Sequence, residues 1–327
     1  MRRLQVGSSD VEIPAIGLGC MGMSEFYGPA DRGECERTLA AALDLGAVHF
    51  DTADMYGYGA NETLLGEFLA AAGRRARAVL ATKFGILRDP SDPHARALDT
   101  RPAYVAKACE ASLARLRTDR IDIYYAHRLS PDVPVEETVG AMARLVAAGK
   151  VRALGLSEVS GDTLRRAHAV HPIAAVQSEY SLWSRDVEDD VLPVCRELGT
   201  AFVAYSPLGR GQLAGLAGGA LAADDFRRRL PRFAEGNLAR NERLARALGD
   251  LGASLGCTQA QLALAWAIAQ PGVAAIPGTR KLARLRENVA AAALSPTPEM
   301  LAQIGALMAA EQVAGARYGN ATSLAAR

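Results

Sequence analysis

The chain has 327 residues, half of them hydrophobic, and its 37 basic side chains nearly balance its 36 acidic ones. A chain of this size buries enough apolar surface to fold without disulfides or a structural metal. The even charge balance gives no electrostatic reason for nucleic acid or a membrane surface as the main partner, so small molecules are the expected partners.

The five cysteines are scattered and form no C-x-x-C pair, which argues against a disulfide framework and against a zinc site. No export signal stands at the N-terminus, and no apolar stretch is long enough to span a bilayer. We therefore expect a cytoplasmic protein without a bound metal. The oligomeric state does not follow from the sequence.

The chain starts with a pattern typical of a β-hairpin, residues 2–19, with a turn at GSSD. Its second arm leads into Gly17, Gly19 and Gly22, which spell G-x-G-x-x-G, the fingerprint of a Rossmann turn. A true Rossmann turn opens a helix directly and has an acidic partner about 20 residues further on. Here an irregular stretch follows, and Asp51 comes too late. We interpret the glycines as a loop that passes close to a cofactor.

Beyond the hairpin, short apolar runs alternate with longer amphipathic segments, as in a parallel sheet with crossover helices. The buried strands are expected at residues 14–19, 48–50, 78–84, 121–127, 151–157, 174–180, 201–207 and 273–278. Helices between them include residues 34–46, 61–73, 102–117, 135–149 and 161–170. Eight such pairs without a break in composition predict an α/β fold, a (β/α)₈ TIM barrel in which residues 1–327 form one domain.

Two longer connections, residues 85–102 and 209–233, are expected to be irregular loops. Both leave the carboxyl ends of strands, the face at which barrel enzymes hold their active sites. Within the second loop, FRRRLPRF is expected to be a basic segment that either stays in solvent or contacts a cofactor phosphate.

Reactive side chains gather on that same face. Three consecutive strands end in Asp51, Lys83 and His127, and Tyr56 lies in the loop after the first of them. Any one of these residues alone is commonly structural, but four at one barrel mouth indicate a catalytic site. A neighbouring ammonium favours the phenolate, so Lys83 is expected to make proton donation by Tyr56 easier, with Asp51 as its counter-ion. His127 is expected to orient a carbonyl oxygen.

The later strands point to a nucleotide. Ser157, Gln177 and Tyr205 follow or occupy adjacent strands and suit a flat heterocycle with a carboxamide. After the last strand, basic side chains crowd the start of a predicted helix, against its dipole, which indicates a bound phosphate. These side chains are Arg280, Lys281 and Arg284. If the anion is a ribose phosphate, NADP(H) is preferred over NAD(H).

These residues together resemble the aldo-keto reductase family over essentially the whole chain. The motifs that carry the resemblance are DTADMYG, ATKFG, YYAHR, GLSE, AYSPLGRG and IPGT followed by REN. The resemblance implies reduction of an aldehyde or ketone with NADP(H), with Tyr56 as general acid. Lys83 and Asp51 would activate Tyr56, and His127 would orient the carbonyl group.

The resemblance also implies cofactor contacts along the carboxyl ends of the strands. The residues are Gly19, Cys20, Met21 and Asp51 near the nicotinamide ribose; Ser157, Gln177 and Tyr205 at the nicotinamide; Ser206, Pro207, Leu208, Gly209, Arg210 and Gly211 at the pyrophosphate; and Gly278, Thr279, Arg280, Arg284, Glu287 and Asn288 at the adenosine end. The substrate pocket would be lined by Met21, Phe26, Tyr27, Tyr56 and His127. Glu158 departs from the pattern, because many relatives have Asn there.

Two alternatives remain open. Lys83 could be the nucleophile of a Schiff-base aldolase or lyase, although Asp51 would keep it charged. The chain could instead be a regulatory subunit that senses the cofactor and turns over slowly, since an intact set of four catalytic residues does not exclude this.

Overall fold

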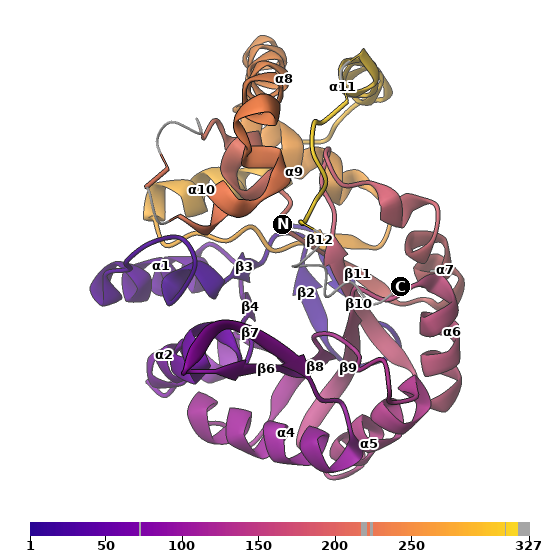
Figure 1. Cartoon of the computed structure of the whole chain (residues 1–327). Helices are drawn as coiled ribbons and strands as arrows, with labels where there is room; N and C mark the ends of the chain where they lie inside the picture. The colour runs from indigo at the N-terminus through magenta and orange to yellow at the C-terminus, as the bar shows by residue number, and fades with distance from the viewer. Residues whose placement is uncertain (72, 217–220, 223–224, 311, 320–327) are drawn as a thin grey trace.

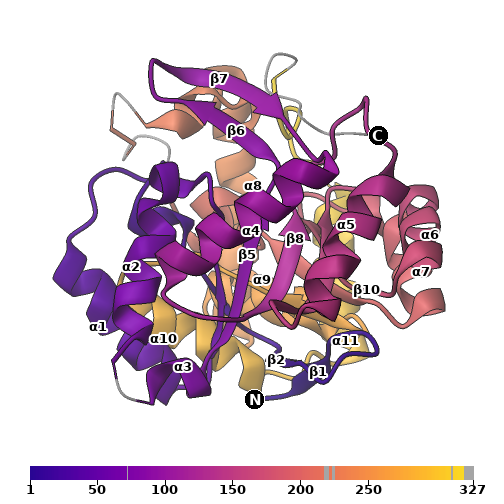
Figure 2. The same ribbon diagram turned by 90° about the horizontal axis from the view of Figure 1, so that it is seen from below.

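The computed structural model describes residues 1–71, 73–216, 221–222, 225–310 and 312–319. It begins with the predicted antiparallel hairpin, in which β1 (Arg3–Gln5) pairs with β2 (Glu12–Pro14). The hairpin lies at the bottom of the view in Figure 2, at the amino-terminal end of the central strands. It therefore covers the end of the molecule opposite to the predicted site.

Eight parallel strands form the central sheet, in the order β12-β11-β10-β9-β8-β5-β4-β3. Isolated bridges join Ile16 to Ala275 and Gly19 to Gly278, so the first and last strands meet and the predicted (β/α)₈ barrel closes. The strands are β3 (Leu18–Gly19), β4 (His49–Asp51), β5 (Val79–Phe84), β8 (Ile121–Ala126), β9 (Val151–Ser157), β10 (Ile173–Glu179), β11 (Ala201–Tyr205) and β12 (Val273–Ala275).

The strands read as apolar runs because both of their faces are covered. Every residue of β8 and of β10 is buried. Inside the barrel, the ring of Tyr125 packs over Gly155, where an added Cβ would lie 2.2 Å from a ring carbon. Only glycine leaves room for that ring, so this pair sets the packing of the barrel interior between β8 and β9.

Helices surround the sheet, as Figure 1 shows. They are α1 (Arg32–Asp44), α2 (Ala60–Leu69), α3 (Arg74–Arg77), α4 (Pro102–Leu116), α5 (Val135–Ala147), α6 (Gly161–Val170), α7 (Val191–Leu198), α8 (Glu235–Ser254), α9 (Gln259–Ala269), α10 (Leu282–Ala290) and α11 (Pro298–Ala310). Short 3₁₀ turns include η1 (Met21–Met23), η2 (Tyr56–Gly59), η3 (Asp186–Glu188), η4 (Gly209–Ala214), η6 (Phe226–Arg229), η7 (Pro231–Phe233) and η8 (Ala291–Ala293). None of the described helices is both long and apolar enough to cross a membrane.

Local capping explains where several helices begin. The side chain of Asp31 accepts a hydrogen bond from the backbone N–H of Glu34 at the start of α1. Thr258 and Gln261 form a reciprocal capping box at the start of α9. The five helices predicted from periodicity are all present, and their ends agree within about one turn.

The prediction of an irregular loop at residues 85–102 is wrong. Residues 85–102 contain a second antiparallel hairpin, β6 (Ile86–Asp89) and β7 (Asp92–Leu98), which lies at the top of the view in Figure 2. Arg88 anchors it by an ion pair with Glu25 and by stacking its guanidinium on the ring of Tyr58. Glu25 also accepts a hydrogen bond from the backbone N–H of Gly57. The hairpin is therefore tied to the loops that follow β3 and β4.

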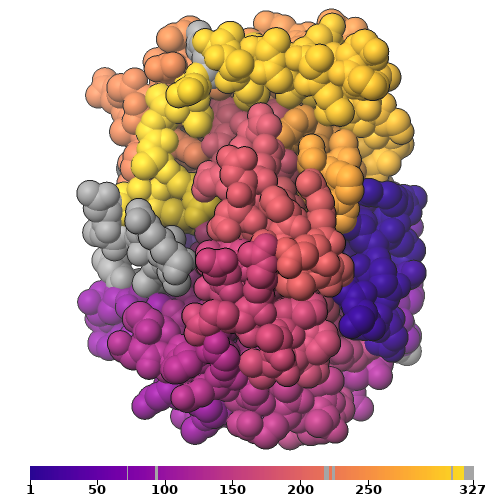
Figure 3. All heavy atoms as spheres, turned by 90° about the vertical axis from the view of Figure 1, so that its right-hand side faces the viewer, coloured from indigo at the N-terminus to yellow at the C-terminus, as the bar shows by residue number. Residues whose placement is uncertain are grey.

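The last described residues return to the same end of the barrel. Figure 3 shows this yellow segment running down the surface from α11 at the top. Both polar atoms of the Asn241 side chain bond to the backbone of Ala314, at 2.8 and 2.9 Å. After Ala314, Arg317 pairs with Glu158 at 2.6 Å, and Tyr318 contacts Tyr205. The tail is thus part of the wall around the barrel mouth.

Candidate active site

A cavity of about 810 Å³ opens at the carboxyl ends of the strands. Its size is typical of a site for a small organic ligand. All five predicted substrate-pocket residues, Met21, Phe26, Tyr27, Tyr56 and His127, line it. Apolar side chains from the loop after β4, from β6 and from the loop after β11 complete this part of the wall, namely Met55, Ile86, Phe226 and Leu230.

The four predicted catalytic residues come together at the floor of the cavity. The ammonium of Lys83 donates to Asp51 Oδ1 at 2.5 Å and to the backbone oxygen of Thr52 at 2.8 Å. It also lies 5.2 Å from the centre of the Tyr56 ring. The Tyr56 and His127 rings meet edge to face, with 5.9 Å between their centres. Lys83 itself is fully buried and does not line the cavity, so it acts from beneath Tyr56.

The charge on Lys83 is held by its partners. Burial alone would lower the pKa of Lys83, but Asp51 and Tyr56 raise it above its ordinary value. Asp51 in turn accepts a hydrogen bond on its other oxygen from the side-chain amide of Gln177, at 2.8 Å. A buried ion pair whose remaining lone pairs are satisfied keeps its geometry. Lys83 therefore presents a fixed positive charge to Tyr56.

The pKa of Tyr56 shifts against the simple sequence expectation. Burial raises it above its ordinary value of 10.0, and the Lys83 charge opposes that rise without reversing it. The expected effect of Lys83 is present, but desolvation of the phenol is larger. Burial, Lys83 and Arg128 all hold the pKa of His127 well below its ordinary value, so its imidazole is neutral. The site offers two neutral donors, Tyr56 and His127, beside the cations Lys83 and Arg128.

The residues predicted to hold a cofactor form a continuous strip along the cavity. Those that line it are Gly19, Cys20, Met21, Asp51, Ser157, Gln177, Tyr205, Ser206, Pro207, Leu208, Arg210, Gly211, Gly278, Thr279, Arg280, Arg284, Glu287 and Asn288. Gly209 is outside this set, and a Cβ there would meet the rings and methyl groups of Trp183 and Leu213. The strip runs from β3 around β9, β10 and β11 to α10.

Two residues at the middle of the strip, and Glu158 next to it in the chain, already have partners. Gln177 is bound to Asp51, and the hydroxyl of Ser157 accepts from Arg128 at 3.2 Å. Glu158 does not line the cavity. One of its oxygens accepts from the backbone N–H of Glu179 at 2.8 Å, and the other pairs with Arg317. The position at which many relatives have Asn therefore anchors the C-terminal tail here.

The basic residues around α10 also have partners within the protein. Arg280 donates to the backbone oxygens of Gly22, Tyr27 and Gly28, and so ties the loop after β12 to the loop after β3. Lys281 pairs with Glu34 at 2.7 Å, and Arg284 pairs with Glu287 at 2.8 Å, with both basic side chains more than half exposed. Exposed pairs of this kind contribute little free energy, so an anion can replace the carboxylates.

The segment 226–233 is solvated only in part. Arg228 and Arg229 are exposed, as expected. Arg227 lines the cavity and pairs with Asp225 at 2.7 Å. Arg232 is buried and donates to the backbone oxygen of Trp183 at 2.7 Å. Residues 217–220 and 223–224 of the predicted loop lie outside the described residues.

Sequence reasoning missed three residues of the site. Arg128 follows His127 directly and lines the cavity. Tyr318 also lines it, with its hydroxyl 3.0 Å from that of Tyr205 and its ring 4.8 Å from the Arg210 guanidinium carbon. Buried Asn61 donates to the backbone oxygen of Cys20 and accepts from Thr52, which joins the loops after β3 and β4. The arginine in YYAHR was a visible signal, whereas no sequence pattern marks Tyr318.

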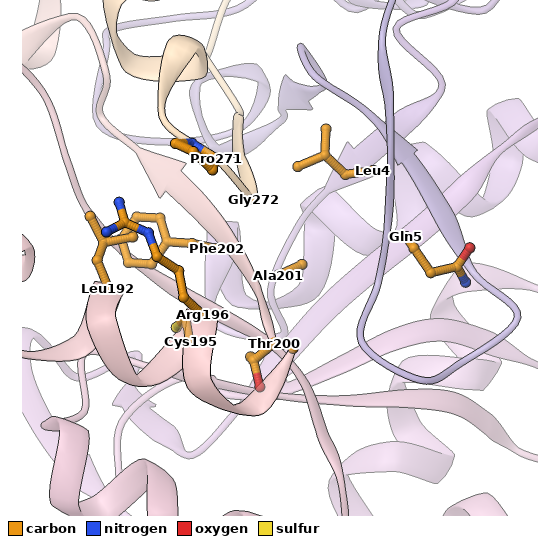
Figure 4. Close-up of a pocket in the computed structure, with 11 residues that line it drawn as sticks. Leu4, Gln5, Leu192, Cys195, Arg196, Thr200, Ala201, Phe202, Pro271 and Gly272 are labelled. Atoms are coloured by element: carbon orange, nitrogen blue, oxygen red, sulfur yellow. The ribbon is translucent and has the colours of Figure 1, made fainter.

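A second cavity, of about 320 Å³, lies at the opposite end of the barrel (Figure 4). It is bounded by β1, α7 and the starts of β11 and β12, and its wall includes Leu192 and Phe202. None of the predicted site residues lines it. Among the described residues, no group of three or more His, Cys, Asp or Glu side chains is arranged to hold a metal.

Asp54, in the loop that carries Tyr56, predicts a pH effect on stability. Burial and Glu62 raise its pKa to about 8 from an ordinary value of 3.8. Between these values the folded chain binds a proton that the unfolded chain has lost, so stability falls as pH rises through this window. We expect Asp54→Asn to remove this loss, with a gain in Tm over the wild type that grows from about pH 5 to about pH 8. Differential scanning fluorimetry measures Tm against pH for both proteins, with a substitution of an exposed residue, Asp132→Asn, as the control. A gain in Tm that does not depend on pH would contradict the assignment of this effect to Asp54.

Comparisons with known proteins agree with this geometry. The model of the "Aldo/keto reductase family" matches residues 15–309. A solved glycerol dehydrogenase from Gluconobacter oxydans superposes with a TM-score of 0.85 at 28% identity, over 94% of this chain and 95% of that one.

Two solved structures from Klebsiella pneumoniae are also similar. One is an aldo/keto reductase in complex with NADP and acetate, with 31% identity, a TM-score of 0.74 and 98% of each chain covered. The other is an aldo-keto reductase in complex with NADPH, with 33% identity and a TM-score of 0.74, over 94% of this chain and 95% of that one.

Proposed function

The chain belongs to the aldo/keto reductase family and is an oxidoreductase, and we propose that it reduces aldehydes and ketones to alcohols with NADPH as the reductant. The observation that carries this proposal is the buried Lys83–Asp51 ion pair beneath Tyr56, with neutral His127 beside it. That arrangement suits the delivery of one proton to an oxygen that is becoming an alkoxide. The five cysteines are all free, which supports a reducing compartment such as the cytoplasm.

The donors along the cavity fit NADP(H). The first turn of α10 has no side-chain cap, so its backbone N–H groups are available to a phosphate. Exposed Lys281 and Arg284 stand beside it and hold only surface pairs. The residues at this end would hold the ribose phosphate, and Ser157, Gln177 and Tyr205 would surround the nicotinamide. We also propose that residues 1–327 work as one domain.

In the proposed reaction, each catalytic residue has one task. Held by the residues of the cavity strip, a bound NADPH would supply a hydride for the carbonyl carbon. Neutral His127 donates a hydrogen bond to the carbonyl oxygen and fixes its position, and Tyr56 gives its hydroxyl proton to that oxygen. Lys83 stabilises the phenolate that Tyr56 leaves, because its charge lowers the cost of forming it. Asp51, held by Gln177, keeps Lys83 in place.

A Schiff-base reaction at Lys83 fits this geometry less well. The nucleophile of such a reaction must be a neutral amine in contact with the substrate. Lys83 has a raised pKa, is fully buried and does not line the cavity. No contact in the described residues distinguishes an active reductase from a slow cofactor sensor, so turnover must decide between them.

The test is the loss of NADPH absorbance with a panel of aldehydes and ketones, repeated with NADH. We expect turnover with NADPH. We also expect Arg284→Ala to raise the KM for NADPH about tenfold, because one charge-assisted contact with the ribose phosphate is lost. The KM for NADH, which lacks that phosphate, should stay nearly unchanged. Arg286→Ala, on the same helix but outside the cavity lining, is the control. Absence of turnover with every carbonyl compound would contradict the proposed function.

A further inference from the structure

Arg128 is a charged side chain at the chemical end of the cavity to which the proposed reaction gives no task. It follows His127 at the end of β8, lines the cavity and is 9% exposed. Its guanidinium donates to the backbone oxygen of His127 at 2.5 Å and to Ser157 Oγ at 3.2 Å. Its Nε is buried and has no hydrogen-bond partner among the described residues. A buried guanidinium with only neutral acceptors is costly to hold.

The carboxylates near Arg128 are committed to other cations. Asp51 holds Lys83. Glu158 influences Arg128 electrostatically, but its oxygens bond to Arg317 and to the backbone N–H of Glu179.

The next carboxylate along the wall is shared in the same way. Glu179 pairs with Arg210 at 2.7 Å and lies 3.5 Å from Arg232. Five basic side chains therefore share three buried carboxylates, with exposed Asp186 3.8 Å from Arg317 as a fourth. Arg128 forms no ion pair within the described part of the chain. At the chemical end of the cavity, Arg128 is therefore the cation whose charge an anion from outside would balance.

The position of Arg128 relates that anion to the reaction. Arg128 bonds to the backbone oxygen of His127 and lines the same cavity as Tyr56 and His127, the two groups that would receive a carbonyl oxygen. The only acidic residues in the described cavity wall are Asp51 and Glu287, and each is paired with a cation. No free acidic side chain in that wall would repel an anion bound beside Tyr56.

We propose that Arg128 binds a carboxylate of the substrate, and that the preferred substrates are 2-oxo acids or aldehydes that carry a carboxylate a few bonds from the carbonyl group. The guanidinium suits this role, because its planar donors match the two oxygens of a carboxylate. This inference rests on the proposed function, since it assigns the substrate class of the same site.

The test compares matched substrates in the full-length protein with NADPH. The pairs are phenylglyoxylate with its methyl ester, and succinic semialdehyde with butanal. In Arg128→Met, which keeps side-chain length without charge, we expect kcat/KM for the two acids to fall about 10- to 100-fold, as for loss of a charged hydrogen-bonding partner. The loss for the uncharged compounds should be at least several-fold smaller than for the acids, and Arg128→Lys should recover part of the loss for the acids.

A binding measurement separates the anion site from turnover. With NADP⁺ present, benzoate is expected to raise the Tm of the wild type and of Arg128→Lys, but much less that of Arg128→Met. Arg128→Met should itself fold, because it removes an uncompensated buried charge, and its Tm without ligand checks this.

The outcomes separate the two proposals. Turnover of the uncharged compounds without a preference for the acids would overturn the role of Arg128 and leave the proposed function standing. If kcat/KM in Arg128→Met fell equally for acids and uncharged compounds, and NADPH bound more weakly by fluorescence titration, the role of Arg128 in substrate binding would also be overturned. Arg128 would then contribute to cofactor binding. An Arg128-dependent shift with benzoate but no turnover of any carbonyl compound would support the anion site and contradict the proposed function.

Discussion

Tyr56→Phe is expected to lower kcat for carbonyl reduction by about 10²- to 10⁴-fold, the contribution of a positioned general acid. The change removes one oxygen and keeps the ring, so its packing against His127 and Lys83 is retained. The dissociation constant for NADPH, measured by fluorescence titration, should stay nearly the same. Loss of turnover with retained cofactor binding would identify Tyr56 as the proton donor and not as a structural residue.

The matched control for this experiment is Tyr58→Phe. Tyr58 lies in the same short turn but is 46% exposed, does not line the cavity and bonds through its hydroxyl to Arg88. We expect near wild-type kcat in this variant. Full activity in Tyr56→Phe would remove the general acid from the proposed mechanism and would reopen the alternative reactions of the site.

The second large effect is expected from the buried pair of Lys83 and Asp51. Removing one partner of a buried ion pair costs about 3–5 kcal/mol, because the remaining charge is left without compensation. For a chain of this length that corresponds to a fall in Tm of roughly 4–7 °C. We therefore expect both Lys83→Met and Asp51→Asn to lose this much stability, as measured by differential scanning calorimetry, together with most of their activity.

The double variant separates stability from catalysis. With Asp51→Asn and Lys83→Met combined, no unpaired charge remains, so Tm should recover toward the wild-type value while activity stays low. Asp44→Asn is the surface control, since Asp44 and its partner Arg77 are both more than half exposed and the pair contributes little. Additive losses of stability in the double variant would show that the two charges do not depend on each other.

The barrel, and the grouping of Asp51, Tyr56, Lys83 and His127 at its mouth, could be predicted because both follow from local order. Each buried strand is a short apolar run, and in a parallel barrel all strands end at one face. Residues such as Lys83 and His127 could therefore be assigned to a common site from their position at strand ends alone. The prediction needed no knowledge of loop conformation.

The remaining parts depend on contacts between segments that are far apart in the chain. The position of the hairpin β6–β7 depends on Arg88 meeting Glu25, which lies 63 residues away in the chain. Tyr318 reaches Tyr205 across more than a hundred residues. The pair Arg284–Glu287 has helical i,i+3 spacing and was predictable, whereas Lys281–Glu34 joins two separate helical regions. Counter-ions of this second kind carry no local sequence signal.

The bridges Ile16–Ala275 and Gly19–Gly278 have a consequence for how the chain folds. They are among the most non-local pairings in the molecule, and chain entropy must be lost before such pairings form, which makes them slow. Gly19 and Gly278 both line the active-site cavity, so the ligand site and the closed barrel depend on the same contacts. A partly folded chain with its helices already formed would have no complete site, and recovery of ligand binding during refolding is thus a direct readout of barrel closure.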